Sequence, residues 1–175
     1  MDPHLQQLRD EIESLTISLT TEELRWHPEG KWSASEIIEH LYLTYTGTTK
    51  GFSRVLTSAG ASKRPTVKQR VAAMIVVDFG YFPSGIQSPA VARPRGAPSQ
   101  QVLAEIVSKI DEMDATMNTC ASKFGSHAKV MDHPFLGPFS IAQWRKFHLR
   151  HGMHHLKQIQ RLRSLMPAVV ERTND

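Results

Sequence analysis

Four of the nine histidines in this chain stand within eight residues, from His148 to His155. Histidine is the commonest metal ligand in proteins and a frequent acid–base group. His151 and His155 are four residues apart, so on a helix they are neighbours on one face. Two imidazoles at that spacing can bind one metal ion, as they do in the H-E-x-x-H zinc motif. The glutamate of that motif is absent here, so a third ligand has to come from elsewhere in the chain.

The helix that should begin at Ser140 places this pair on its inner side. At about 100° per residue, one side of it carries Trp144, His148, His151, His155, Ile159 and Leu162. An imidazole that faces a core needs a partner, since burying an unpaired polar group costs about 1–3 kcal/mol. Two histidines at this spacing, taken alone, are more often surface residues or satisfied core residues. The apolar flanks favour a metal, which would supply a partner for both.

The third ligand is not fixed by periodicity. His40 lies at the flank of the apolar face of a predicted helix, and geometry does not separate it from His27 or His133. His148, one turn before His151, is expected to line the site or to donate a hydrogen bond to it; the alternative is a core histidine bonded to a backbone carbonyl.

Glu36 precedes His40 by one turn, so it is a candidate to orient that imidazole or to act as a base. The simpler interpretation makes Glu36 the third residue of a helix-capping box that begins at Ser33. Glu36 and His148 are therefore the weak catalytic candidates. Cys120 is not expected to be a nucleophile.

Helix-start signals predict the elements that position these residues. We expect helices over residues 3–19, 33–58, 66–82, 99–123 and 140–165, and a short extra turn from Thr20. Irregular loops should cover residues 60–65, 83–98 and 125–138, and no strand alternation is evident. Long helices joined by irregular loops predict an all-α fold, a four-helix bundle with an additional short helix and long loops. Residues 1–166 should form a single domain, with residues 167–175 as a C-terminal tail.

Length and composition indicate the number of domains and the location of the protein. A chain of 175 residues with 40% hydrophobic residues suits one globular domain. No apolar run approaches the roughly 20 residues of a membrane helix. The polar, acidic beginning from Asp2 lacks the order of a signal peptide, and the single Cys120 cannot form an internal disulfide. These features predict a cytoplasmic protein.

The net charge of +4 and the pI of about 9.4 raise the question of nucleic acid. The cations are spread along the chain, however. The densest patch, within residues 145–163, fits the solvated face of one helix and consists of Arg145, Lys146, Arg150, Lys157, Arg161 and Arg163. Nucleic acid is therefore not the expected partner, and a small-molecule substrate is favoured.

Three segments together resemble one family. Residues 31–41 (KWSASEIIEHL) resemble the W-S-x-x-E-h-h-x-H-L segment of the DinB/YfiT-like superfamily. Residues 133–140 (HPFLGPFS) resemble its loop before the last helix. Residues 151–159 (HGMHHLKQI) resemble its H-x-x-x-H-x-x-Q-I signature. The segments keep the family's order and span most of the chain.

The resemblance implies a four-helix bundle, often a homodimer, that holds nickel, zinc or another divalent ion through three histidines. Carried over onto this sequence, those are His40, His151 and His155. His154 is turned about 100° from His155 and is the less suitable ligand. Many relatives carry an acidic residue where this chain has Gly152, which weakens the assignment of a supporting carboxylate there.

The resemblance also suggests reactions. Characterised relatives include thiol-dependent S-transferases and a maleylpyruvate isomerase that use low-molecular-weight thiols. Three imidazoles leave a coordination position open, as catalytic zinc sites do. The leading hypothesis is metal-dependent transfer of a small thiol to an electrophilic substrate. The alternatives are a metal-dependent hydrolase and a non-catalytic metal- or ligand-binding bundle. A role in the DNA damage response is suggested only by the family's name, and the dispersed charge gives it little support.

Overall fold

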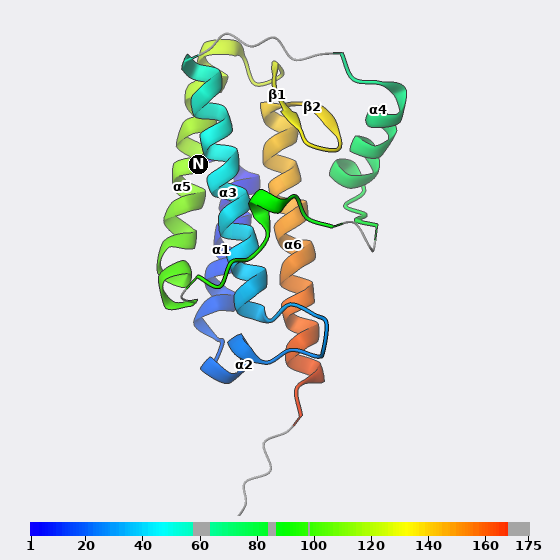
Figure 1. Ribbon diagram of the computed structural model, residues 1–175. Helices are drawn as coiled ribbons and strands as arrows, with labels where there is room; N and C mark the ends of the chain where they lie inside the picture. Colours follow the sequence, from blue (N-terminus) through cyan, green and yellow to red (C-terminus); the bar gives the residue numbers. More distant parts are fainter. Residues whose placement is uncertain (58–63, 84–86, 98, 168–175) are drawn as a thin grey trace, which may run out of the picture.

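The computed structural model describes residues 1–57, 64–83, 87–97 and 99–167. Four long helices form a bundle: α1 (Pro3–Ile17), α3 (Ala34–Thr57), α5 (Ser99–Phe124) and α6 (Ile141–Leu165) (Figure 1). The short helix α2 (Thr21–Arg25) joins α1 to α3, and α4 (Val67–Ala73) lies to the side of the bundle. The predicted all-α fold, a four-helix bundle, is confirmed. Of the predicted tail, residues 168–175 lie outside the described part of the chain.

Side chains at the helix starts explain why these segments fold locally. Each cap oxygen accepts a hydrogen bond from a backbone N–H that the helix itself leaves unpaired. The Ser33 hydroxyl accepts from the Glu36 N–H at 3.3 Å, and the Glu36 carboxylate accepts from the Ser33 N–H at 2.8 Å. Reciprocal capping boxes of the same kind are present at Thr20, Thr66 and Ser140. The capping box predicted at Ser33 and the extra turn from Thr20 are thus observed.

The helices α3 and α5 run in the same direction, and α6 runs opposite to both (Figure 1). Tyr42, early in α3, donates to the Glu105 carboxylate early in α5 at 2.7 Å. Near their far ends, Lys123 donates to the Leu56 carbonyl at 3.0 Å. Because parallel neighbours cannot be joined by a tight turn, the chain between α3 and α5 returns along the bundle. That return brings the 3₁₀ helix η2 (Ala90–Ala92) against the first half of α3.

The helix predicted over residues 66–82 is shorter than expected. The α-helix ends at Ala73 and continues as a π-helical segment, η1 (Met74–Asp78). Gly80 then adopts a positive φ of 68°, which ends the helical path. Phe79 and Tyr81 are exposed, so no packing favours extending the helix through them. The expectation for residues 79–82 was wrong for this reason.

A β-hairpin stands where an irregular loop was expected. Strands β1 (Lys129–His133) and β2 (Gly137–Ser140) pair antiparallel, with an irregularity between Lys129 and Met131. All four residues of β2 are buried, so this strand shows no alternation of polar and apolar residues. The absence of strands predicted from the missing alternation was therefore wrong.

The core fills the space between the four long helices, and a few charged side chains are buried with it, among them Arg145. Arg145, predicted to belong to a solvated face, is only 8% exposed. Its guanidinium lies 3.6 Å from a carboxylate oxygen of Asp2 and 3.6 Å from one of Asp114. The basic patch thus contains one cation that holds the start of α1 to α5 and α6 instead of facing solvent.

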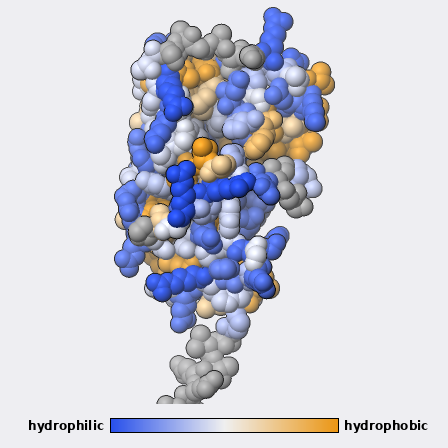
Figure 2. Space-filling view, viewed as in Figure 1, coloured by the Kyte–Doolittle hydropathy of each residue, from blue (hydrophilic) through white to orange (hydrophobic). Residues whose placement is uncertain are grey.

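Hydrophilic side chains cover much of the face seen in Figure 2, and apolar side chains gather at its upper right, where Figure 1 places α4. Val67, Val71 and Met74 are among the exposed apolar residues of this region. None of the helices in the described ranges is long and apolar enough to cross a membrane.

Candidate metal centre

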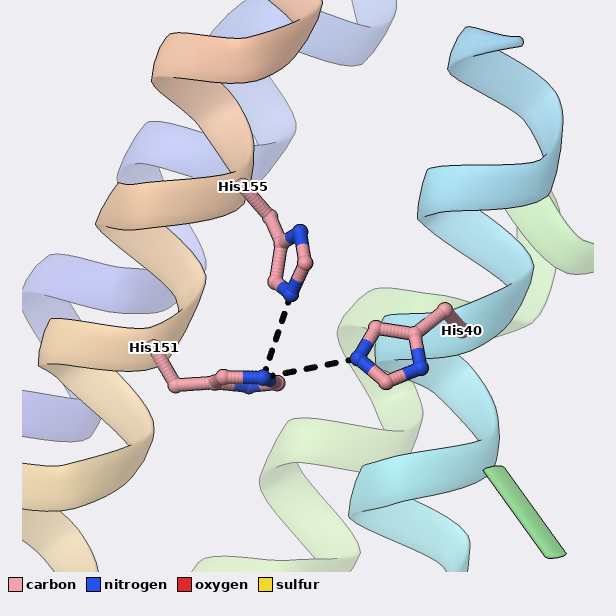
Figure 3. A group of neighbouring side chains, drawn as sticks. All are labelled: His40, His151 and His155. Atoms are coloured by element: carbon pink, nitrogen blue, oxygen red, sulfur yellow. Dashed lines mark hydrogen bonds between the residues drawn. The ribbon is translucent and has the colours of Figure 1, made fainter. Parts of the chain in front are cut away.

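The three histidines carried over from the family resemblance meet between two antiparallel helices. His40 comes from the first half of α3, and His151 and His155 come from the middle of α6 (Figure 3). The Nε2 atom of His151 lies 3.4 Å from that of His40 and 3.1 Å from that of His155. Two nitrogens on a tetrahedral zinc ion are about 3.3 Å apart, given Zn–N bonds of about 2.0–2.1 Å. The spacing therefore suits one shared ion.

The hydrogen bonds of the outer ring nitrogens set which nitrogen of each ring carries the proton. His40 Nδ1 lies 2.7 Å from the Ala92 carbonyl, and His155 Nδ1 lies 2.8 Å from the Gln158 Oε1. Both oxygens can only accept, so each Nδ1 must donate. In a neutral imidazole the other nitrogen then carries a lone pair. His40 and His155 consequently direct lone pairs at the same point.

Hydrogen bonds among the three rings cannot satisfy all of their nitrogens, because of the third ring, His151. A proton on His151 Nε2 can be donated to only one of the two facing lone pairs. Its other nitrogen, Nδ1, is buried and has no hydrogen-bond partner in the described part of the chain. Placing the proton on Nδ1 instead brings three lone pairs together, which is favourable only around a cation. The donor set therefore fits a metal ion.

Burial keeps these rings neutral. It lowers the pKa of His155 to about 3, and it lowers that of His151 well below the ordinary 6.5, with the other histidines adding to both shifts. For His40, burial also lowers the pKa, against a smaller opposite effect of the Ala92 carbonyl. Neutral imidazole is the form that binds metal. At neutral pH the three imidazoles are thus uncharged and able to bind a metal ion. Their lowered pKa values mean that a bound proton does not readily take the place of that ion.

Two further groups connect the ligands to the scaffold. The Gln158 amide accepts from His155, and its NH₂ group donates to His154 Nε2 at 3.0 Å, so both ends of the amide are held. The 3₁₀ helix η2 presents the Ala92 carbonyl to His40. Supporting contacts of this kind orient metal ligands and select their tautomer.

Aromatic rings surround the cluster. The Phe147 ring stacks on His151 with centroids 5.3 Å apart, and the Phe82 ring lies 5.7 Å from His151. Trp32 lies 5.4 Å from His40. These contacts restrict the rotation of the rings and make the surroundings of the three nitrogens apolar, which strengthens electrostatic interactions there.

The two weak catalytic candidates are placed differently. The Glu36 carboxylate caps α3 through the backbone and hydroxyl of Ser33, and no hydrogen bond links it to the histidines in the described residues. His148 is fully buried, and neither of its ring nitrogens has a hydrogen-bond partner there. Within the described residues, neither a hydrogen bond from His148 to the site nor one to a backbone carbonyl is present. Burial, with a smaller effect of His133, lowers the pKa of His148 to about 3.

The remaining candidates do not belong to the three-histidine cluster. His27 is exposed and contacts its neighbour Pro28. His133 accepts from two backbone N–H groups and packs against Phe139 and other aromatic rings. Cys120 is buried and burial raises the pKa of its thiol, which disfavours the thiolate.

The groups that support the ligands had no role assigned from the sequence, although Gln158 stands in the H-x-x-x-H-x-x-Q-I segment. Gln158 had a local signal, because it follows His155 by three residues on the same helix face. Ala92 contributes its backbone carbonyl. Every residue has one, so the residue type does not indicate this role. Glu39, next to His40, is a buried carboxylate whose partners at residues 95–97 are distant in sequence.

The chain belongs to the DinB superfamily, whose pattern it matches over residues 4–159. Its structure is similar to that of YfiT from Bacillus subtilis, described as a probable metal-dependent hydrolase with an unusual four-helix bundle topology. The TM-score is 0.60 at 15% sequence identity, and the match covers 92% of this chain and 82% of the other. No curated protein matches this chain in sequence. At that identity the similarity establishes the fold, and the function has to be argued from the site.

Proposed function

We propose that this protein is a metal-dependent enzyme whose His40, His151 and His155 hold one divalent transition-metal ion. The observation that carries the proposal is the convergence of three Nε2 atoms, two of them with their protons committed to the opposite nitrogen. Nickel and zinc are the expected ions, since imidazole nitrogens suit both.

An open coordination position distinguishes a catalytic site from a structural one. No fourth histidine, cysteine or carboxylate joins the cluster within the described ranges. A divalent ion bound there would lower the pKa of a water or thiol at its open position toward neutrality. The chain's own contribution is to hold three neutral imidazoles in fixed orientations within an apolar wall.

Hydrolysis is the reaction we place first. It is supported by the description of YfiT, which shares the fold, and needs no second substrate beyond water. Transfer of a small thiol to an electrophilic substrate is the second candidate, supported by the thiol-dependent enzymes that the sequence motifs resemble. Both reactions use the same open position and small-molecule substrates.

The decisive experiment measures metal content. Wild-type protein and the variants His40→Ala, His151→Ala and His155→Ala are purified alike and examined by elemental analysis, with the exposed His27→Ala as a matched control. We expect about one ion per chain in the wild type and the control, and a large loss in the other three. Unchanged metal content in the three variants would refute the site.

Activity then separates the two reactions. The metal-loaded protein is tested on ester and amide substrates without thiol, and on electrophilic acceptors with small thiols. Turnover of the first set without thiol supports hydrolysis, and a strict thiol requirement supports transfer. Full loading without turnover of either set would favour a non-catalytic metal-binding bundle.

A further inference from the structure

Glu39 is a buried carboxylate beside a metal-ligand histidine, and it is only 3% exposed. One oxygen accepts the backbone N–H of Arg95 at 2.8 Å. The other accepts those of Gly96 and Ala97, each at 3.1 Å. Hydrogen bonds to an ionised acceptor are roughly twice as strong as those between neutral groups. Three consecutive amides are thus fastened to one side chain of α3.

The same loop supplies the acceptor for His40. Ala92 lies three residues before Arg95, and its carbonyl accepts a hydrogen bond from His40 Nδ1 at 2.7 Å. Glu39 and His40 are adjacent on α3, so the loop is attached to the helix at two neighbouring points. Gly96 has a φ of 81°, a conformation that other residues rarely adopt. That turn allows the successive N–H groups to face the same carboxylate.

We propose that Glu39 is a positioning residue of the metal centre: by fastening residues 95–97 to α3, it holds the Ala92 carbonyl against His40 and so leaves the Nε2 lone pair of His40 free for the ion. The inference rests on the proposed metal-dependent function. It assigns the carboxylate a role that acts through a loop and not through contact with the ion.

The chemical reason lies in the two tautomers of neutral imidazole. A ring with its proton on Nε2 presents an N–H to the ion position and cannot be a ligand. A fixed acceptor at Nδ1 removes that tautomer. Loss of such a supporting partner typically lowers metal affinity about 10–100-fold.

The variant Glu39→Gln keeps the shape but replaces one accepting oxygen by an NH₂ group that must face a backbone N–H. We expect Zn²⁺ affinity, measured by competition with a chelator, to fall about 10–100-fold. In the metal-free protein, ¹⁵N NMR of the His40 ring should change from the Nδ1–H form to a mixture of tautomers. A loop contact with only a structural role would lower stability without moving that signal.

Glu105→Gln is the matched control. The Glu105 carboxylate links α5 to α3 by accepting from Tyr42 at 2.7 Å, and in the described structure its hydrogen bonds go to Tyr42 and Gln101 and not to residues 95–97. The glutamine can still accept from the phenol. Affinity and the His40 tautomer should both stay as in the wild type.

Unchanged affinity in a folded Glu39→Gln variant would overturn the inference, and so would reduced affinity with an unchanged His40 tautomer. If Glu39→Gln does not fold, the variant Gly96→Ala tests the inference, because it strains the same turn without altering a charge. It should produce the same two changes, and their absence would count against the inference. If the wild type binds neither Zn²⁺ nor Ni²⁺, the proposed function fails, and the tautomer signal of the metal-free variants still tests whether Glu39 positions His40.

Discussion

The fully buried His148 gives the protein a specific weakness toward acid. Its pKa falls from 6.5 to about 3 on folding, chiefly through burial. Above pH 6.5 the ring is neutral in both states and contributes no pH dependence. As the pH falls toward 3, only the unfolded chain takes up the proton, so stability is lost in that window. For these two pKa values the loss at pH 5 is about 2 kcal/mol.

Replacing the ring should remove that weakness. His148→Leu has a similar volume and eliminates two buried nitrogens that have no hydrogen-bond partner in the described residues. We expect the free energy of unfolding at pH 7 to stay equal or to rise by up to about 2 kcal/mol. Between pH 7 and pH 5 the variant should lose about 2 kcal/mol less than the wild type.

Urea unfolding with a chelator present, at pH 7 and pH 5, measures both quantities without a contribution from bound metal. An equal loss between the two pH values in wild type and variant would refute the reasoning about His148. A strong destabilisation at pH 7 would show that the ring has partners or packing that the leucine cannot replace. Metal content should not change, since neither ring nitrogen of His148 belongs to the cluster.

Three further predictions concern the scaffold. Arg145→Met leaves the buried carboxylate of Asp114 without its cation and should lower the free energy of unfolding by about 3–5 kcal/mol, measured by urea denaturation. Gly152→Ala places a methyl group against the Leu8 side chain and should cost about 1–3 kcal/mol in the same assay. A homodimer, which we propose from the family resemblance alone, should give a molar mass by light scattering of twice the 19.7 kDa of one chain.

Two control substitutions test the physical reasons given for Arg145→Met and Gly152→Ala. Arg161→Met alters an exposed arginine of the same helix and should shift stability by less than about 0.5 kcal/mol. Gly47→Ala adds its methyl group to open space within α3 and should stabilise by up to about 1 kcal/mol. An effect of Arg145→Met as small as that of Arg161→Met would contradict the buried ion pair, and a Gly152→Ala variant as stable as Gly47→Ala would contradict the close packing at Gly152. A single-chain mass at high concentration would rule out the dimer.

The predicted helices agree with the structure where local chemistry decides. A capping oxygen bonds a backbone N–H only two or three residues further on, so Ser33, Thr66 and Ser140 mark helix starts in the sequence itself. The hairpin at residues 129–140 escaped prediction because the burial of β2 comes from neighbouring elements and leaves no alternation in its sequence.

The sequence by itself determined two of the three ligands of the candidate metal centre. His151 and His155 face the same way because a helix turns by about 100° per residue, and no other part of the chain is needed for that. The choice of His40 over His27 and His133 was not available from spacing. It depended on the family resemblance, and only the packing of α3 against α6 places its Nε2 atom 3.4 Å from that of His151.

The tertiary structure alone decided the supporting contacts. Ala92 and residues 95–97 reach α3 because its parallel arrangement with α5 requires a long return of the chain, and the loop is held there by Glu39 and His40. Contacts across more than 50 residues depend on where whole helices lie, and a backbone carbonyl carries no signature in the sequence. The sequence therefore predicted histidine ligands, while the groups that orient them could be identified only from the tertiary structure.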